Sequence, residues 1–374
     1  MTKRLCFIAM LAAACLIGLP AGAGEPIAET PDQRDARLAW WREARFGLFL
    51  HWGPVSLEGT EIGWSRAGER RGYPYGPGKE VPVEIYDNLY KKFNPTYYNP
   101  EEWVALTRAA GMKYVVLTAR HHDGFSMFDT QVSKYKITSP ESPYRRDIVK
   151  ALAEACHKAG MHLGIYYSQP DWHHLDAFTP GRHDRCKAYL RAQLTELLSH
   201  YGKVDYLFFD GLSPDHPANA YGGSALNELA HQLQPQIILN DRNGSPSDFD
   251  TPEQTIGGFR IDRPWETCMT LGDQWAYKLN DQIKSLEQCV QTLVRCAEGD
   301  GNLLLNVGPM LTGAIDPRQA QRLREIGSWL ERYGESIYGT RGGPLKPTKA
   351  YATTRKGNTV YLHVFVSSRT RLTG

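Results

Sequence analysis

The sequence lacks the cysteine pattern of a metal site or of a disulfide-stapled scaffold. Only seven of its 374 residues are cysteine, and no two of them form a C-x-x-C pair. Two lie in the first 15 residues, and the others are scattered at positions 156, 186, 268, 289 and 296. This spacing predicts no metal site, and an odd number of thiols cannot all pair with one another. We assign no disulfides, because a chain of this length can bury a core without them.

The phosphate-binding motifs of nucleotide-dependent enzymes are also missing. Neither G-x-G-x-x-G nor G-x-x-x-x-G-K-[ST] occurs, and no repeat or low-complexity tract is found. Glycine-rich loops of these kinds let backbone amides surround a phosphate, so their absence disfavours the nucleotide-binding α/β folds. We therefore predict no cofactor, and the absence of repeats disfavours a solenoid.

An excess of charge is absent as well. Lys and Arg together number 43 and Asp and Glu 41, and removal of the first 23 residues would take away Lys3 and Arg4 and leave an even balance. A neutral chain is not expected to bind nucleic acid or an anionic membrane surface as its main partner. Apart from the first residues, we find no candidate for a membrane-spanning segment, so we predict no integral membrane span.

The first 23 residues are typical of a signal peptide. Lys3 and Arg4 precede an apolar run that breaks at Pro20, and Ala21-Gly22-Ala23 fits a cleavage site for small residues. We therefore expect export to the periplasm or the outside of the cell. Cys15 follows three alanines, so anchoring as a lipoprotein stays open as an alternative.

What the sequence does contain is a regular alternation of apolar strands and amphipathic helices. Strands separated by helices pair in parallel, and about eight such units over this length favour a closed barrel over an open sheet. We predict an α/β fold: a (β/α)8-like (TIM-type) barrel over residues 24–345 and a short β-rich remnant of a C-terminal domain over 346–374. The expected strands are 45–51, 113–118, 161–167, 204–210, 236–240 and 301–307, and the expected helices are 101–111, 144–160, 184–201, 223–233, 284–297 and 317–333.

Polar side chains follow almost every expected strand, where TIM-type barrels carry their chemistry. Asp210 ends the apolar run VDYLFFDG, and Glu253 lies in the loop DFDTPEQ. Retaining glycosidases use two carboxyl groups about 5–5.5 Å apart, which two acids at one barrel mouth could supply. A single acid at a strand end can instead cap a helix, and Glu266 after Trp265 is a rival for the second carboxyl group. Weaker rivals are Glu43, Glu58 and Glu61.

The adjacent His121 and His122 raise the question of a metal. Neighbouring residues on a strand point to opposite faces, and no H-E-x-x-H motif accompanies them. We therefore predict no metal, and we expect His51, His121 and His122 to bond sugar hydroxyls.

An ordered set of motifs resembles the α-L-fucosidases of glycoside hydrolase family 29. Between Trp40 and Gly343 these are HWGPVS, YVVLTARHHDGF, LGIYYS, FFDG, NDR, WETCMT, GNLLLNVGP and ESIYGTR. The resemblance implies a TIM-type barrel that removes terminal α-L-fucose from glycans by a retaining double displacement without a cofactor. Members of the family usually carry a C-terminal β-sandwich, for which residues 346–374 leave little room.

The resemblance also implies roles for individual residues. Asp210 matches the nucleophile, and Glu253 fits the acid/base, with Glu266 as the alternative because this position varies in the family. Residues that the resemblance places around the sugar are His51, Trp64, His121, His122, Tyr167, Arg242, Glu266 and Trp275. A barrel glycosidase for a related sugar such as an α-galactoside, and a catalytically silent fucose-binding barrel, stay open as alternatives. The fucosyl linkage and the oligomeric state are not encoded in any readable motif.

Overall fold

The computed structural model describes residues 29–68, 78–174, 176, 183–211, 221–258, 260 and 262–365. The expected signal peptide, part of the expected loop 60–80, most of the segment 211–222 and the end of the chain lie outside these residues. Among the helices described, none is both long enough and apolar enough to cross a membrane.

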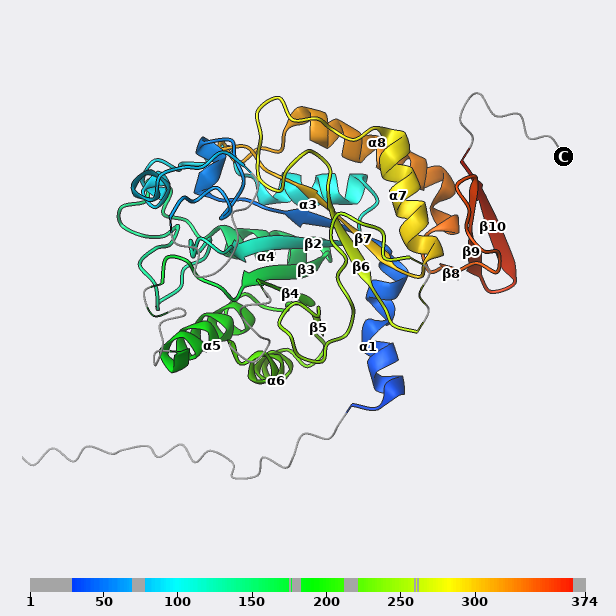
Figure 1. Cartoon of the computed structure of the whole chain (residues 1–374), viewed down its shortest axis with the longest axis horizontal. Coiled ribbons are helices and arrows are strands. Elements are labelled where there is room, and N and C mark those ends of the chain that lie inside the picture. Colours follow the sequence, from blue (N-terminus) through cyan, green and yellow to red (C-terminus); the bar gives the residue numbers. More distant parts are fainter. Residues whose placement is uncertain are drawn as a thin grey trace, which may run out of the picture.

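Seven parallel strands form a curled sheet in the order β5-β4-β3-β2-β1-β7-β6 (Figure 1). The side chains of β1, β2, β6 and β7 are buried throughout. This is expected for barrel strands, because their outward side chains lie under helices and their inward side chains pack against one another. The barrel-like α/β fold predicted from the sequence is thereby confirmed. The strands are β1 Phe46–Leu50, β2 Tyr114–Arg120, β3 His162–Ser168, β4 Tyr206–Asp210, β5 Ile238–Leu239, β6 Glu266–Thr270 and β7 Asn302–Val307.

A short stretch, residues 249–253, closes the gap between β5 and β6, and we call it the closing segment. Single parallel bridges join Asn240 to Phe249 on one side and Asp250 to Trp265 and Glu253 to Cys268 on the other. The closing segment therefore occupies the place of an eighth strand. Its bridges are isolated and do not form a named strand, but backbone hydrogen bonds of Asp250 with Glu266 and of Pro252 with Cys268 attach it to β6.

Helices cover the outside of the barrel, and their ends follow local sequence signals. Asn99 and Asp147 cap α3 and α4 by accepting backbone N–H groups, and α4 ends at Gly160 in the left-handed conformation. No helix separates β5 from the closing segment. The long helices are α1 Pro31–Ala44, α3 Pro100–Ala109, α4 Ile148–Ala159, α5 His183–Ser199, α6 Gly223–Leu233, α7 Leu286–Glu298 and α8 Pro317–Tyr333, and the short ones are α2 Val83–Tyr86, η1 Pro54–Leu57, η2 Leu89–Lys91 and η4 Gly334–Ser336.

A small antiparallel sheet follows the barrel, in agreement with the expected β-rich C-terminal segment. It contains β8 Arg341–Gly342, β9 Tyr351–Lys356 and β10 Thr359–Val364 in the order β10-β9-β8. Gly357, with a φ of 55°, lies in the turn between β9 and β10. In Figure 1 this sheet lies beside α7 at the far right, away from the carboxyl ends of the barrel strands.

Candidate active site

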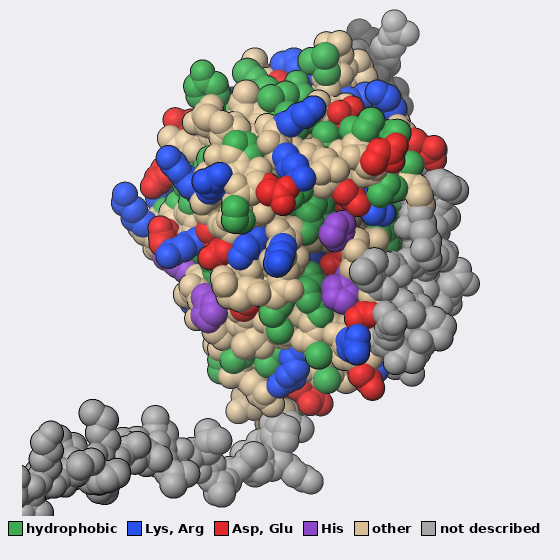
Figure 2. Space-filling view, turned by 90° about the vertical axis from the view of Figure 1, so that its left-hand side faces the viewer, with side chains coloured by type: hydrophobic (Ala, Val, Ile, Leu, Met, Phe, Trp, Pro, Cys, Tyr) green, Lys and Arg blue, Asp and Glu red, His purple; other side chains and the backbone are tan. Residues whose placement is uncertain are grey.

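Asp210 lies at the carboxyl end of β4, inside the barrel mouth. Alternation along the strand sends Leu207 and Phe209 to the core under the outer helices, while Phe208 packs inside the barrel and Asp210 follows at its upper rim. The carboxylate keeps 19% of its surface exposed. Figure 2 views this side of the molecule, where histidine and apolar side chains lie between charged ones.

Three groups surround the Asp210 carboxylate. Its Oδ2 accepts a 2.7 Å hydrogen bond from the Tyr166 hydroxyl, and its Oδ1 accepts a 3.1 Å bond from Arg242 Nη1. His122 Nε2 lies 3.7 Å from Oδ2. Burial by itself raises the pKa of Asp210, but Arg242, His122 and the Tyr166 hydroxyl outweigh it and lower the pKa below the usual value. The carboxylate is therefore ionised and held in one orientation, as a nucleophile requires.

One nitrogen of Arg242 joins the two acids that the sequence singled out. Nη1 is 2.6 Å from Glu253 Oε2 as well as 3.1 Å from Asp210 Oδ1. Nη2 donates to the carbonyl oxygen of Thr251 in the closing segment at 3.2 Å. Glu253 is 39% exposed and faces the solvent side of the mouth, whereas Asp210 is the deeper of the two. The structure thus brings the two acids together at one guanidinium.

Three histidines lie in the mouth beside Asp210. His51 Nδ1 lies 2.8 Å from Asn306 Oδ1, His122 Nδ1 lies 2.7 Å from Ser168 Oγ, and the His121 ring stacks on Tyr166. Burial lowers the pKa of His51 to about 3, that of His122 to about 4, and that of His121 well below its usual value. Neutral imidazoles can donate and accept hydrogen bonds, which suits them to sugar hydroxyls.

His121, His122 and Asp210 are also the one group of possible metal ligands in the described part of the chain, with ligand atoms within 4.8 Å of one another. The oxygens of Asp210 already bond Tyr166 and Arg242. A cation at this place would face the Arg242 guanidinium, so the donor set fits a metal poorly. The absence of a metal stays a prediction from the sequence.

Two indole rings belong to the same mouth. Trp64 meets the His122 ring edge-on at 5.2 Å, and Trp275 tilts against the His51 ring at 4.8 Å. Glu61 ties their loops together, because its buried carboxylate accepts the N–H of Trp275 at 2.9 Å and that of Ala276 at 3.1 Å. Burial raises the pKa of Glu61 to about 7. This acid, a weaker rival in the sequence analysis, holds the two loops together.

Gly211, which follows the nucleophile candidate, is needed for a steric reason. Its φ of 109° is strained for other residues, and a Cβ there would lie 2.2 Å from the ring of Pro170. The same Cβ would approach His122 Cε1 to 3.4 Å. Glycine therefore lets the chain turn away directly after Asp210 without pushing His122 out of place.

The prediction of Tyr167 as a sugar contact is wrong by one residue. Its side chain points outward, with the hydroxyl 3.0 Å from Gln193 Oε1 on α5 and the ring against the Arg120 guanidinium. Tyr166 is the residue that points into the barrel and reaches Asp210. Residues 166, 208 and 210 share a face because β3 pairs Tyr166 with Phe208 and Ser168 with Asp210, a register that the sequence alone does not give.

Replacing Tyr166 by Phe is expected to lower kcat/KM by about ten- to a hundredfold, because a hydrogen bond to the ionised carboxylate of Asp210, the nucleophile candidate, is lost. The bond lowers the pKa of Asp210, so its loss raises that pKa and moves the acidic limb of the pH–rate profile to higher pH. Measuring kcat/KM against pH tests both effects. The matched control is Tyr167→Phe, which removes a hydroxyl from the neighbouring position and is expected to leave the acidic limb in place.

The prediction of Glu266 as a sugar contact or alternative acid is also wrong. Trp265-Glu266-Thr267 was expected near the end of a strand, but Glu266 is the first residue of β6 and lies at the floor of the barrel with no exposed surface. Its Oε1 accepts from the Tyr206 hydroxyl at 2.8 Å, and its Oε2 accepts from Trp41 Nε1 at 2.9 Å and from the Tyr114 hydroxyl. Burial raises the pKa of Glu266 to about 7. It is a hydrogen-bonded core acid.

Comparison with known proteins places this geometry in context. Residues 22–335 match the family model described as alpha-L-fucosidase. The chain is 33% identical over 340 residues to plasma alpha-L-fucosidase of Rattus norvegicus, covering 84% of this chain and 73% of that protein. It is 31% identical over 345 residues to the plasma enzyme of Homo sapiens, covering 86% and 74%. Among solved structures it resembles alpha-L-fucosidase isoenzyme 1 of Paenibacillus thiaminolyticus, with a TM-score of 0.81, 34% identity, and coverage of 88% of this chain and 84% of that one.

Proposed function

This chain belongs to the alpha-L-fucosidase family of glycoside hydrolases, and from that membership we propose that it releases terminal α-L-fucose from glycans with retention of configuration. In this proposal Asp210 is the nucleophile and Glu253 is the general acid and base. Fucosylated oligosaccharides or glycoconjugates are the substrates. The signal-peptide pattern of residues 1–23 supports export of the enzyme to the periplasm or beyond.

The observation that carries the proposal is the shared contact of both carboxylates with Arg242 Nη1. Asp210 Oδ1 lies 3.1 Å and Glu253 Oε2 lies 2.6 Å from Arg242 Nη1, so the distance between these two oxygens is at most the sum of the two contacts. This limit applies to the nearest oxygens of the two carboxyl groups, which therefore lie side by side at the mouth. It is compatible with the roughly 5–5.5 Å of retaining enzymes, in which one carboxylate attacks the sugar directly.

The two steps of a double displacement follow from this arrangement. Asp210 attacks the anomeric carbon of fucose while Glu253 gives a proton to the glycosidic oxygen, so the bond to the leaving alcohol breaks as the ester to Asp210 forms. The free alcohol departs toward solvent on the exposed side of Glu253. Glu253, now ionised, takes a proton from water, and the hydroxide oxygen displaces Asp210 to release fucose.

The remaining side chains of the mouth orient the sugar. His51, His121 and His122 offer neutral ring nitrogens to hydroxyl groups, and the Trp64 and Trp275 rings offer apolar surface to the C–H face of a deoxy sugar. Within the described residues, His121 Nδ1 is a buried nitrogen without a hydrogen-bond partner. This nitrogen has almost no accessible surface, so a sugar hydroxyl would have to bond the other ring nitrogen of His121.

The proposal is tested by incubating the purified mature chain with a 2-deoxy-2-fluoro-fucosyl fluoride and mapping the labelled peptide by mass spectrometry. The fluorine slows hydrolysis of the fucosyl-enzyme, so the expected result is one fucosyl group per chain, attached to Asp210. The matching fluorinated galactosyl fluoride serves as the control and is expected to label slowly, because the sugar site would have to accept a hydroxymethyl group. A label on another acid would contradict the nucleophile assignment, and preferential galactosyl labelling would contradict the choice of sugar.

A further inference from the structure

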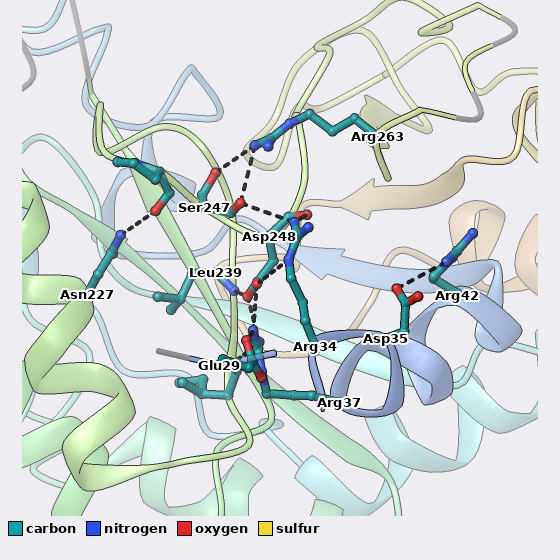
Figure 3. A network of polar contacts seen from close by, with 12 residues as sticks. Glu29, Arg34, Asp35, Arg37, Arg42, Asn227, Leu239, Ser247, Asp248 and Arg263 are labelled. Carbon is teal, nitrogen blue, oxygen red and sulfur yellow. Dashed lines mark hydrogen bonds and ion pairs between the residues drawn. The ribbon is translucent and has the colours of Figure 1, made fainter. Parts of the chain in front are cut away.

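A cluster of three arginines at the opposite end of the barrel from the mouth has no part in the chemistry described above. Arg34 and Arg37 come from α1 and Arg263 from the loop before β6, and they meet Ser247 and Asp248 just before the closing segment begins (Figure 3). Each guanidinium already bonds carboxylates or carbonyl oxygens. The cluster therefore attaches the chain at Ser247 and Asp248 to α1 and to the loop before β6. We name Arg34, Arg37, Asp248 and Arg263 the clamp.

Asp248 is the centre of the clamp. Its Oδ2 accepts 2.7 Å and 2.9 Å hydrogen bonds from Arg37 Nη1 and from the N–H of Leu239 in β5, and its Oδ1 accepts a 2.8 Å bond from Arg37 Nη2. Arg34 Nη2 donates to the Asp248 carbonyl oxygen at 2.7 Å. The side chains of Arg37 and Asp248 are only 4% and 7% exposed. Arg37 also pairs with Glu29 at 2.6 Å, so it keeps one carboxylate if Asp248 is changed, whereas a change of Arg37 would leave Asp248 buried without its main counter-charge.

The clamp fixes the start of the closing segment, which carries Glu253. Asp248 precedes the closing segment directly, and Glu253 is its last residue. Between them, backbone hydrogen bonds join the segment to β6, through Asp250 with Glu266 and Pro252 with Cys268, whereas the bridge of Asn240 with Phe249 is isolated on the β5 side. Glu253 itself is partly exposed. At the start of the segment, the two arginines of α1 bind Asp248, while Arg260 and Arg263 pair with Asp250 inside the segment. A shift at Asp248 is therefore passed along an extended backbone to Glu253, a span of about 17 Å.

Asp210 does not depend on the clamp in this way. It ends β4, which pairs in a continuous register with β3 up to the pair Ser168 and Asp210. The end of β5 is fixed separately, because the Asn240 side chain accepts from the Phe209 N–H at 2.8 Å and donates to the Phe209 carbonyl oxygen at 2.9 Å. A disturbed clamp should then move the acid/base relative to a nucleophile that stays in place.

We propose that the clamp between α1 and Asp248 is a positioning device for the general acid/base Glu253, acting through the closing segment from the opposite end of the barrel. The inference rests on the proposed function, since it assumes that Glu253 donates the proton to the leaving group. It assigns a role in catalysis to the N-terminal helix, which contributes no residue to the barrel mouth.

The test is Asp248→Asn, which keeps the shape of the side chain but removes the charge that pairs with Arg37. Aryl α-L-fucosides with leaving groups from nitrophenol to unsubstituted phenol are compared, because a misplaced acid matters most when the leaving group needs a proton. We expect kcat/KM for the phenyl fucoside to fall about tenfold more than for the nitrophenyl fucoside. An equal fall for both substrates, or an unchanged ratio in a folded variant, overturns the proposal.

Asp300→Asn is a closely matched control. Asp300 also pairs with two arginines, Arg42 of α1 and Arg45 directly after it, and its side chain is also 7% exposed, but it precedes β7 instead of the closing segment. It is expected to lower stability without changing the ratio between substrates. The same change of ratio in this variant would show a general effect of α1 and would overturn the proposal.

Two further variants keep the result interpretable. If Asp248→Asn does not fold, Arg34→Met is used instead, because Arg34 is 37% exposed and its replacement should disturb the fold less. It is expected to change the ratio of kcat/KM between nitrophenyl and phenyl fucosides in the same direction by a smaller factor. An unchanged ratio in Arg34→Met then overturns the proposal. Glu253→Ala is measured on the same substrates. If Glu253→Ala shows no dependence on the leaving group, the acid/base assignment itself fails, whereas dependence in Glu253→Ala but not in the clamp variants overturns only the positioning role.

Discussion

Replacing Asp210 by glycine is expected to lower kcat by at least about a thousandfold, because the fucosyl-enzyme can no longer form. The variant removes the carboxylate that Tyr166 and Arg242 hold in place and leaves a small space lined by hydrogen-bond donors. Added azide should occupy that space and attack the same face of the sugar. The expected product is β-fucosyl azide, which NMR spectroscopy distinguishes from the α-anomer, and the rate should rise with azide concentration.

A control for this experiment lies directly before the same strand. Asp205 precedes β4 at the opposite end, where it pairs with His162 and Lys203. Asp205→Asn should change stability more than turnover, and azide should have no effect on it. If Asp210→Gly kept its activity, or if azide yielded the α-azide, Asp210 could not be the nucleophile.

Glu253→Ala is expected to give the second largest effect, and the size should depend on the substrate. General acid catalysis contributes about 10²–10⁴-fold when the leaving group needs a proton. The value of kcat/KM for phenyl fucoside and for natural linkages should fall by that order. The value for nitrophenyl fucoside should fall far less, because its leaving group departs as an anion in the first step. Measuring kcat/KM over a series of aryl fucosides gives the slope that reports this dependence.

Glu266 provides the comparison for that slope, because it was the rival acid in the sequence. Its carboxyl group accepts hydrogen bonds from Trp41, Tyr114 and Tyr206 at the barrel floor. Glu266→Gln should therefore reduce thermal stability and lower kcat/KM by the same factor for all aryl fucosides. A steep leaving-group dependence in this variant, with none in Glu253→Ala, would reverse the assignment.

The alternation of strands and helices was predictable from the sequence because apolar runs and capping residues are local signals. Most of the expected strands and helices agree with the structure to within a few residues, as do the positions of Asp210 and His51 at strand ends. The choice between Tyr166 and Tyr167 was not local. It depends on which face of β3 meets the barrel interior, and that follows only from its register with β4.

The closing segment and Glu266 show a different limit. A strand is recognised by its run of apolar residues, but Phe249 is the one large apolar side chain in residues 249–253, so no such run marks this segment. Because no strand was expected at residues 249–253, Glu266 was placed among the polar residues that follow strands. In the structure Glu266 begins β6. The contact of Asp210 and Glu253 with Arg242 joins three separate parts of the chain, and only the folded barrel brings them together.

The isolated bridges of the closing segment have a consequence for how such enzymes can diverge. Residues 243–246 and 254–258 lie outside the continuous ladders of the sheet and carry neither Arg242 nor a clamp residue, so insertions or deletions there leave the pairing of β1–β4 and of β6–β7 intact. Under the proposed mechanism, a lineage can therefore move its proton donor along the sequence by a few residues without refolding the barrel. The proposed nucleophile has no such freedom, since a one-residue slip of β4 would turn Asp210 out of the mouth. Descendants of one ancestor should then share the position of the first acid and differ in the second.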